Sequence, residues 1–367
     1  MYSSLVKLNP NWLSHPGQSL YDVLEEKRMS PDSLAEKIKV DLNEIQEILK
    51  GQKDITDSVA TKLENELGIP QKFWLSRQRQ YKEFKQVFLK NQEKAWLDSL
   101  PIKDMIKFGW LSGVKSELTD QCLDFFNLKQ VPQSLDSSAN FAQGGVRFRT
   151  STKYEAHIGS TNVWIRQGER CAEKIECNEW NLELLCDKLE SMRALCNVKK
   201  PNEYIPKLKE ICAECGIILV VIRPTSGCRA SGATKFLPSG KALILMSFRH
   251  KSDDHFWFTF FHEIGHLIYH NSQQRTFVDE DSNWQENLNL EEQEANKFSG
   301  DLLIPYSILP ELSKMKRDKR TIVRMALKLG VSPGILIGQM QHHNIIDFSY
   351  LNGYKRRYSN EEIPFDC

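Results

Sequence analysis

The chain has 367 residues, which is long enough for two or three domains that each bury a core of their own. Its 49 basic and 48 acidic side chains nearly cancel, so its overall charge does not indicate a polyanionic partner. No segment is apolar over the length that spans a bilayer, and residues 1–11 hold no basic cluster leading into a long apolar run, so we expect a cytoplasmic protein without a membrane partner.

Residues 1–80 are predicted to form an all-helical domain. Ser30-Pro31 supplies an N-cap followed by a proline at the first helical position, and Asp41 and Asp57 are the predicted caps of the two helices that follow. The run 68–70 (GIP) ends the last of these helices. Short helices around one small core are typical of a helix-turn-helix domain.

The same stretch resembles the Cro/C1-type helix-turn-helix domain, and more narrowly the form found in HigA-like antitoxins. The residues that carry this resemblance are the runs 15–17 (HPG), 30–35 (SPDSLA), 48–51 (ILKG) and 67–75 (LGIPQKFWL). The resemblance implies a helix-turn-helix fold and makes operator DNA a candidate partner.

The sequence departs from this family where DNA would be contacted. The predicted recognition helix opens with Asp41 and carries Glu44 and Glu47, whereas helices that read bases usually offer Arg, Lys, Gln or Ser there. Carboxylates repel phosphates, and Lys39 stands where the family usually has a glycine in a left-handed turn. Binding of operator DNA therefore stays open beside a role in substrate docking or in forming a homodimer.

Residues 81–200 are predicted to be a mainly helical connecting region. Apolar residues recur at helical spacing through 105–110, 163–165 and 182–195. The polar, glycine-containing stretch 134–145 is predicted to be a linker or a surface loop.

The pattern changes in residues 201–345. Short apolar runs at 217–222 and 242–247 are predicted strands, and the apolar stretch 254–271 is a predicted helix. Such runs indicate a small sheet covered by helices, so we expect the whole protein to be mainly α with a small β-sheet, an α+β fold. Residues 346–367 are expected to be a C-terminal tail.

The nine cysteines are odd in number and scattered along the chain, and without a secretory signal they are expected to be reduced thiols. Cys212 and Cys215 form a lone CxxC pair. We expect these two thiols to pack a helix, with a redox or zinc-knuckle role as the alternative.

The run 260–266 (FFHEIGH) is the pattern that most strongly indicates chemistry. His262 and His266 lie four residues apart and project from one helical face, so both imidazoles can bind a single metal ion. Glu263 lies beside the first histidine, where it can act as general base toward a water at the metal. The alternative is a pair of histidines that satisfy ordinary hydrogen bonds.

A catalytic zinc site takes three protein ligands, so a third one is needed. A straight helix spreads three successive histidines over roughly 12 Å, so we expect His270 to lie behind a ligand or at the surface. Glu292 and Asn296 share a face of the following helix, so Glu292 can bind the metal while Asn296 supports a ligand. Glu291 is the fallback, and an exposed acidic helix start is the alternative.

Residues from about 205 to 345 resemble the ImmA/IrrE family of zinc-dependent endopeptidases. The resemblance is carried by the runs 232–235 (GATK), 245–249 (LMSFR), 253–266 (DDHFWFTFFHEIGH), 292–296 (EQEAN), 302–305 (LLIP) and 330–335 (GVSPGI). It implies a zincin-like peptidase domain in which His262, His266 and Glu292 bind Zn²⁺ and Glu263 is the catalytic base. A helix-turn-helix domain fused to such a peptidase is a known arrangement in this family.

His342 also matches a position of the family. A histidine there can stabilise the oxyanion of a tetrahedral intermediate. His343 and Tyr269 are rival candidates for this role, and a purely structural histidine is a further alternative. Arg249 is expected either to bind substrate or to pair with an acidic residue at 253–254.

The sequence therefore predicts a zinc endopeptidase joined to a helix-turn-helix module. By resemblance, its protein substrate is a repressor or an antitoxin, cleaved to release transcription or a toxin. The rival interpretation is a DNA-binding or antitoxin-like regulator without proteolytic activity, whose metal site is structural or senses a ligand.

Overall fold

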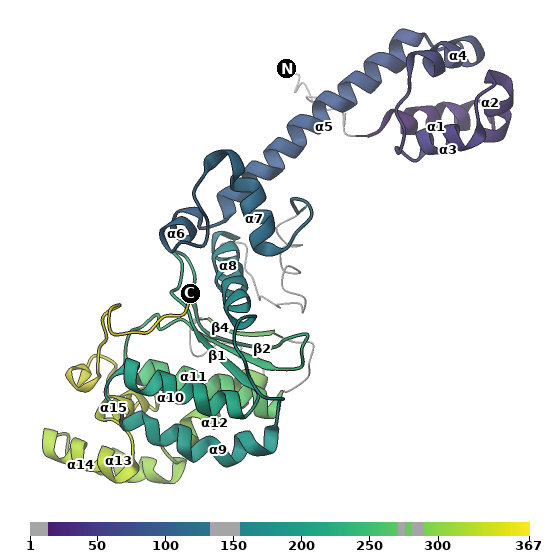
Figure 1. Cartoon of the computed structure of the whole chain (residues 1–367). Helices are drawn as coiled ribbons and strands as arrows, with labels where there is room; N and C mark the ends of the chain where they lie inside the picture. Colours follow the sequence, from purple (N-terminus) through teal and green to yellow (C-terminus); the bar gives the residue numbers. More distant parts are fainter. Residues whose placement is uncertain (1–13, 133–154, 271–275, 281–289) are drawn as a thin grey trace, which may run out of the picture. The chain divides into compact units, whose positions relative to one another are not determined.

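The computed structural model describes residues 14–132, 155–270, 276–280 and 290–367. The chain divides into two compact units, Met1–Ala95 and Trp96–Cys367, and each has an apolar core of its own (Figure 1). Helices and one small sheet make up the regular structure, so the fold is α+β and mainly helical, as predicted. The domain limits expected at residues 80, 200 and 345 stay predictions.

The first unit is a bundle of short helices around one core, in which Leu20, Ile45 and Trp74 are fully buried. The helices are α1 (Pro16–Glu26), α2 (Pro31–Ile38), α3 (Leu42–Leu49), α4 (Asp57–Leu67) and α5 (Gln71–Ser99), the last of which continues beyond this unit.

Local side chains begin and end the helices of this unit. Ser30 and Asp41 each accept a hydrogen bond from a backbone N–H of the next turn, at 3.2 and 2.7 Å, so both predicted caps are confirmed. The third cap is Thr56, whose hydroxyl accepts a backbone N–H at 3.3 Å, so the predicted Asp57 is wrong by one residue. Lys39 ends α2 in the left-handed conformation, with φ of 52°, where glycine is the residue without strain.

Helix α3 stands where a helix-turn-helix domain carries its recognition helix. Asp41 is exposed at its start. The Lys53 ammonium lies 3.2 Å from the Glu44 carboxylate and 4.0 Å from that of Glu47. One lysine thus balances part of the charge of these acids, and the helix still presents carboxylates where a DNA-reading helix presents donors.

The second unit adds helices on both faces of a four-stranded sheet. Its helices are α6 (Ile102–Lys107), α7 (Leu118–Phe126), α8 (Glu155–Ala172), α9 (Leu182–Ala194), α10 (Pro201–Glu214), α11 (Asp253–Tyr269), α12 (Leu290–Leu303), α13 (Leu309–Lys314), α14 (Lys319–Leu329) and α15 (Pro333–His342). Its strands are β1 (Ile217–Val221), β2 (Ala230–Phe236), β3 (Ala242–Met246) and β4 (Thr276–Glu280). The predicted strands correspond to β1 and β3, whereas β2 and β4 carry no strong apolar pattern and were missed. The whole of the predicted linker 134–145 lies outside the described residues.

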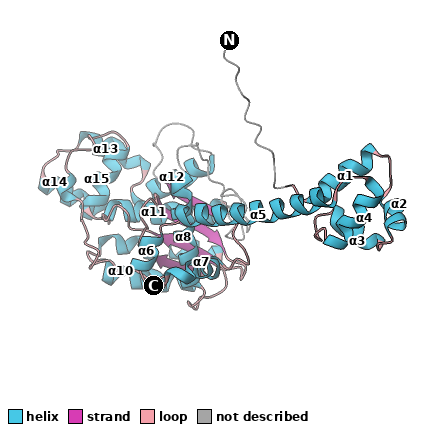
Figure 2. Cartoon of the chain, turned by 90° about the horizontal axis from the view of Figure 1, so that it is seen from above, coloured by secondary structure: helices cyan, strands magenta, loops and turns pink. Residues whose placement is uncertain are grey.

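The strands lie in the order β1-β3-β2-β4, with β1 parallel to β3 and β2 antiparallel to both β3 and β4. Side chains alternate between the two faces. Ile217 and Leu219 belong to the core shared with α10 and α11, whereas Ile218 and Val220 belong to the core under α8. Figure 1 shows α8 on one face of the sheet and α10 and α11 on the other, and Figure 2 shows the strands among the helices that surround them.

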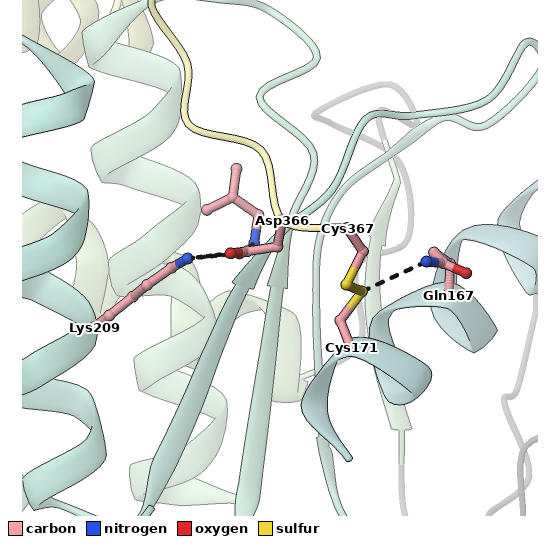
Figure 3. Close-up of a disulfide and its surroundings, with 6 residues drawn as sticks. Gln167, Cys171, Lys209, Asp366 and Cys367 are labelled. Atoms are coloured by element: carbon pink, nitrogen blue, oxygen red, sulfur yellow. Dashed lines mark hydrogen bonds and ion pairs between the residues drawn. A yellow bond between two sulfur atoms is a disulfide. The ribbon is translucent and has the colours of Figure 1, made fainter. Parts of the chain in front are cut away.

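The C-terminal residues 346–367 pack against the second unit. Tyr358 and Ile363 are buried in its larger core. The Asp366 carboxylate accepts a hydrogen bond from the Val221 backbone N–H at 2.8 Å and lies 2.6 Å from the Lys209 ammonium (Figure 3). The end of the chain is thereby tied to the end of β1 and to α10.

Cys171 in α8 and Cys367 form a disulfide, which corrects the expectation that all nine cysteines are reduced (Figure 3). Their Cα atoms are 6.3 Å apart, although 196 residues separate them in the chain. The packing of the C-terminal segment brings the two cysteines together, and their spacing in the sequence does not predict this pairing. Cys212 and Cys215 are free and fully buried in the core, as expected for helix-packing thiols.

Among the described residues, no single helix is long and apolar enough to cross a membrane. The pair α14 and α15, bent by 95° at the break between them, passes the same test by length and composition only.

Candidate metal centre

Two adjacent helices bring two imidazoles and a carboxylate together. The ligand atoms of His262, His266 and Glu292 all lie within 4.8 Å of one another. The two Nε2 atoms are 3.0 Å apart, and the Glu292 carboxylate oxygens lie 3.2 Å from the first and 3.5 Å from the second. Three donor atoms that converge at this spacing are suited to one small cation.

Close packing of α11 and α12 makes this convergence feasible. Both histidines are 2% exposed, because the whole middle of α11 is buried. Gly265 lies between them, and a Cβ atom there would be 3.1 Å from the Ala295 Cα atom of α12. The Ser299 hydroxyl donates to the Phe258 carbonyl at 2.7 Å and joins the helices one turn further on. A glycine opposite an alanine therefore lets α12 approach close enough to supply a ligand.

A second layer of contacts orients the two imidazoles. His262 Nδ1 lies 3.0 Å from Asn296 Oδ1, so a proton on Nδ1 is donated to the amide and Nε2 is left for a metal. His266 Nδ1 lies 3.3 Å from His270 Nδ1, and His270 Nε2 lies 2.8 Å from a Glu294 carboxylate oxygen. Asn296 therefore contacts His262 at Nδ1, and His270 contacts His266 at Nδ1. Glu294 in turn contacts His270.

The electrostatics of the triad favour the ligand forms of its groups. Burial lowers the pKa of His266 more than its hydrogen bond to Glu292 raises it, so the imidazole is neutral at neutral pH. Burial by itself raises the pKa of Glu292, but hydrogen bonds from His262 and His266, and the positive charge that these imidazoles carry when protonated, outweigh it, so the pKa lies well below its usual range. Neutral imidazoles and an ionised carboxylate are the forms that bind a divalent metal.

Glu263 follows His262 directly and is fully buried. Its carboxylate accepts a hydrogen bond from the Thr234 hydroxyl of β2 at 2.6 Å. In the sequence, Thr234 belongs to the run 232–235 that resembles the ImmA/IrrE family, and no role was predicted for it. The available signal was a glycine and a threonine two residues apart, Gly232 and Thr234, which a strand places on one face.

A pocket of about 330 Å³ lies beside Asn296, the residue that contacts His262 Nδ1. Its walls include Asn296, Lys297 and Asp301 of α12, the exposed Tyr306, and His342 and His343 at the end of α15. The predicted His342 lies with its ring 5.8 Å from that of Phe258, which in turn lies 6.4 Å from the His262 ring. Burial and the neighbouring His343 charge lower the pKa of His342, so its imidazole is neutral at neutral pH.

The remaining predicted residues take other positions. Tyr269 is 55% exposed at the end of α11. The Arg249 guanidinium donates to the Arg229 carbonyl at 2.9 Å. The two acidic residues predicted as its partners make other contacts. The Ser332 hydroxyl donates to the Asp253 carboxylate at 2.6 Å, and the Lys355 ammonium lies 2.6 Å from the Asp254 carboxylate.

A small mixed sheet, a buried His-Glu-x-x-His helix and a carboxylate from the next helix define a metallopeptidase-type domain. Residues 229–337 match the family model Peptidase_M78, the IrrE N-terminal-like domain, and this part of the chain is a domain of that family. The match includes the triad and Glu263 and ends before His342.

Two solved structures show similarity to parts of the chain. One is a putative antidote protein of a plasmid maintenance system from Nostoc punctiforme, 27% identical over 23% of this chain and 92% of that chain, with a TM-score of 0.22. The other is an addiction module antidote protein of the HigA family from Coxiella burnetii, 30% identical over 22% of this chain and 88% of that chain, with a TM-score of 0.20. The comparison with curated proteins found no match.

Proposed function

We propose that this chain is a zinc-dependent endopeptidase joined to a helix-turn-helix module. The observation that carries the proposal is the convergence of His262, His266 and Glu292 beside the buried Glu263. Membership of residues 229–337 in a metallopeptidase family supports it.

The donor set fits zinc. Two imidazoles and one carboxylate are the ligands of one common class of catalytic zinc site, which keeps a coordination position for water or substrate. The lowered pKa of His266 and the ionised Glu292 agree with metal binding at neutral pH. Both histidines also have a hydrogen-bond partner at Nδ1, which is the arrangement that outer contacts give to zinc-binding imidazoles.

When bound, zinc supplies Lewis acidity toward a substrate carbonyl and toward water. Glu263 then takes the proton of the attacking water and passes it to the leaving amine. His342, in the wall of the adjacent pocket, is proposed to donate a hydrogen bond to the oxyanion of the tetrahedral intermediate. The same pocket is suited to hold a substrate side chain next to the scissile bond.

The proposed substrate is a repressor or an antitoxin, cleaved so that transcription or a toxin is released. This part of the proposal is supported by the resemblance to the ImmA/IrrE family. The N-terminal unit is proposed to recruit that substrate or to form a homodimer. Operator DNA is the alternative partner, against which the carboxylates of α3 argue.

The proposal is tested on full-length protein loaded with zinc. Metal content is measured by mass spectrometry of the purified protein, and cleavage is measured as new termini in a proteome-derived peptide library. We expect about one zinc per chain and defined cleavage products, with cleavage lost in Glu263→Gln while zinc stays bound. Undiminished cleavage in that variant, or no cleavage by the zinc-loaded wild type, contradicts the peptidase function.

A further inference from the structure

We infer that Thr234 is a positioning residue, which holds the Glu263 carboxylate in the orientation that its proton transfer requires. The inference rests on the proposed peptidase function and extends it to a residue of the sheet. Thr234 lies in the middle of β2, is 2% exposed, and donates its hydroxyl proton to Glu263 Oε2 at 2.6 Å. As the proposed general base, Glu263 acts in its ionised form, and a short hydrogen bond from a hydroxyl to an ionised carboxylate is of the strong class.

The part of this sheet face that β1 and β3 form against α11 is apolar. Ile217, Leu219 and Val221 of β1 lie on this face, as do Ile244 and Met246 of β3. Thr234 pairs with Ile244 across the sheet and therefore points to the same side. A hydroxyl that is buried in an apolar layer is unfavourable unless it is hydrogen-bonded, and valine has the same shape without that cost. The hydrogen bond of this hydroxyl to the Glu263 carboxylate therefore explains why a threonine stands at this position.

Gly232, two residues before Thr234, leaves space for the same carboxylate. A Cβ atom at Gly232 would lie 2.3 Å from Glu263 Oε1, which is far inside contact distance. The register of β2 against β4 also shifts between Ala230 and Gly232. Such an irregularity turns the backbone locally and is a common device beside active sites. β2 thus accommodates one carboxylate oxygen at Gly232 and binds the other through Thr234.

This arrangement restricts the rotation of the Glu263 side chain. A helix side chain with three rotatable bonds has several rotamers, and the hydrogen bond to Oε2 selects among them. A general base must hold its oxygen within about 3 Å of the proton that it abstracts, so a carboxylate of fixed orientation transfers protons more effectively. Loss of the hydroxyl should therefore lower the rate of the chemical step and leave substrate binding unchanged.

The test compares Thr234→Val, which removes the hydroxyl at constant shape, with Thr234→Ser, which keeps it. The matched control is Thr225→Val, because Thr225 is also buried and donates its hydroxyl to a backbone carbonyl, that of Ser160, at 3.2 Å. Steady-state kinetics use the best-cleaved peptide of the library. The second readout is the dissociation constant of a hydroxamate of that peptide, because a hydroxamate bound at the metal also gives its proton to the base.

For Thr234→Val we expect kcat about 10- to 100-fold lower, the effect of losing one hydrogen bond to a charged group, with KM within about twofold of wild type. Hydroxamate binding should weaken about 10-fold by the same loss. Thr234→Ser should restore both, Thr225→Val should change neither, and zinc content should stay at the wild-type level in all variants. If Thr234→Val does not fold, Thr234→Ala against Thr234→Ser carries the same comparison.

Wild-type kcat and wild-type hydroxamate affinity in Thr234→Val overturn the inference, and so does a Thr234→Ser variant as impaired as Thr234→Val. Neither result contradicts the proposed peptidase function, because both are measured against a wild-type protein that cleaves the peptide. A zinc-loaded wild type that cleaves nothing contradicts the proposed function instead, so the two failures are distinguishable.

Discussion

Replacement of Asn296 by alanine should weaken zinc binding without touching a ligand. The Asn296 amide oxygen is the acceptor behind His262, at 3.0 Å from Nδ1. Because His262 is 2% exposed, its Nδ1–H group would lose a buried partner, which costs about 1–3 kcal/mol. A factor of ten in affinity corresponds to about 1.4 kcal/mol, so the upper limit is a weakening of about 100-fold.

The pocket beside Asn296 decides where in this range the effect falls. Asn296 lines that pocket, which has a volume of about 330 Å³ and can admit a water molecule in place of the amide. A water replaces part of the lost hydrogen bond, so we expect zinc affinity to fall by about 10- to 30-fold, in the lower part of the range for second-layer partners.

The measurement is a competition titration of zinc against a chromogenic chelator at neutral pH. Asn197→Ala is the matched control, because the Asn197 amide donates to the Gly330 carbonyl at 2.8 Å and makes no contact with the triad. Zinc affinity of Asn296→Ala within about twofold of wild type, or an equal loss in Asn197→Ala, would refute the reasoning.

Two further predictions concern stability. Asp254 and Lys355 form an ion pair at 2.6 Å that is 7% and 8% exposed, so Asp254→Asn should lower the free energy of unfolding at neutral pH by about 3–5 kcal/mol through an uncompensated lysine. Burial raises the pKa of Asp254, but the His255 and Lys355 charges lower it below its usual 3.8. The stabilisation by the ion pair is therefore present above pH 3.8 and is lost as the pH falls further. The free energies of unfolding of wild type and variant, measured with denaturant, should converge in acid, and a difference that stays constant with pH would contradict the assignment. Lys39→Gly should raise the free energy of unfolding of residues 14–95 by about 1 kcal/mol, because Lys39 has a φ of 52°, and thermal unfolding showing no change or a loss would speak against strain there.

Local patterns predicted the parts of the fold that local forces determine. The caps Ser30 and Asp41 were predictable because a side-chain oxygen reaches the N–H groups of its own first turn. Thr56 was missed by one residue, because Thr and Asp are both good caps and the sequence offers them in succession. The two histidines of α11 follow in the same way from helical spacing.

The sequence was also sufficient to predict Glu292 and Asn296 as neighbours of the two histidines, because both residues lie on one face of the next helix. Two helices in succession commonly pack side by side. Their contacts with His262 then follow from one helix pair alone. β2 and β4 could not be found this way, because β2 contains glycine, threonine and lysine and lacks the apolar run that marks a buried strand.

Only the tertiary structure decided the contacts between distant segments. It places the Thr234 hydroxyl against Glu263, 29 residues further along the chain, and Cys171 against Cys367. It also packs the expected C-terminal tail against β1 through Asp366. Helical spacing and caps depend on neighbours within about four residues, which the sequence displays directly. Contacts across the sheet depend on how whole elements pack and in which register, and that is settled only when the core is closed.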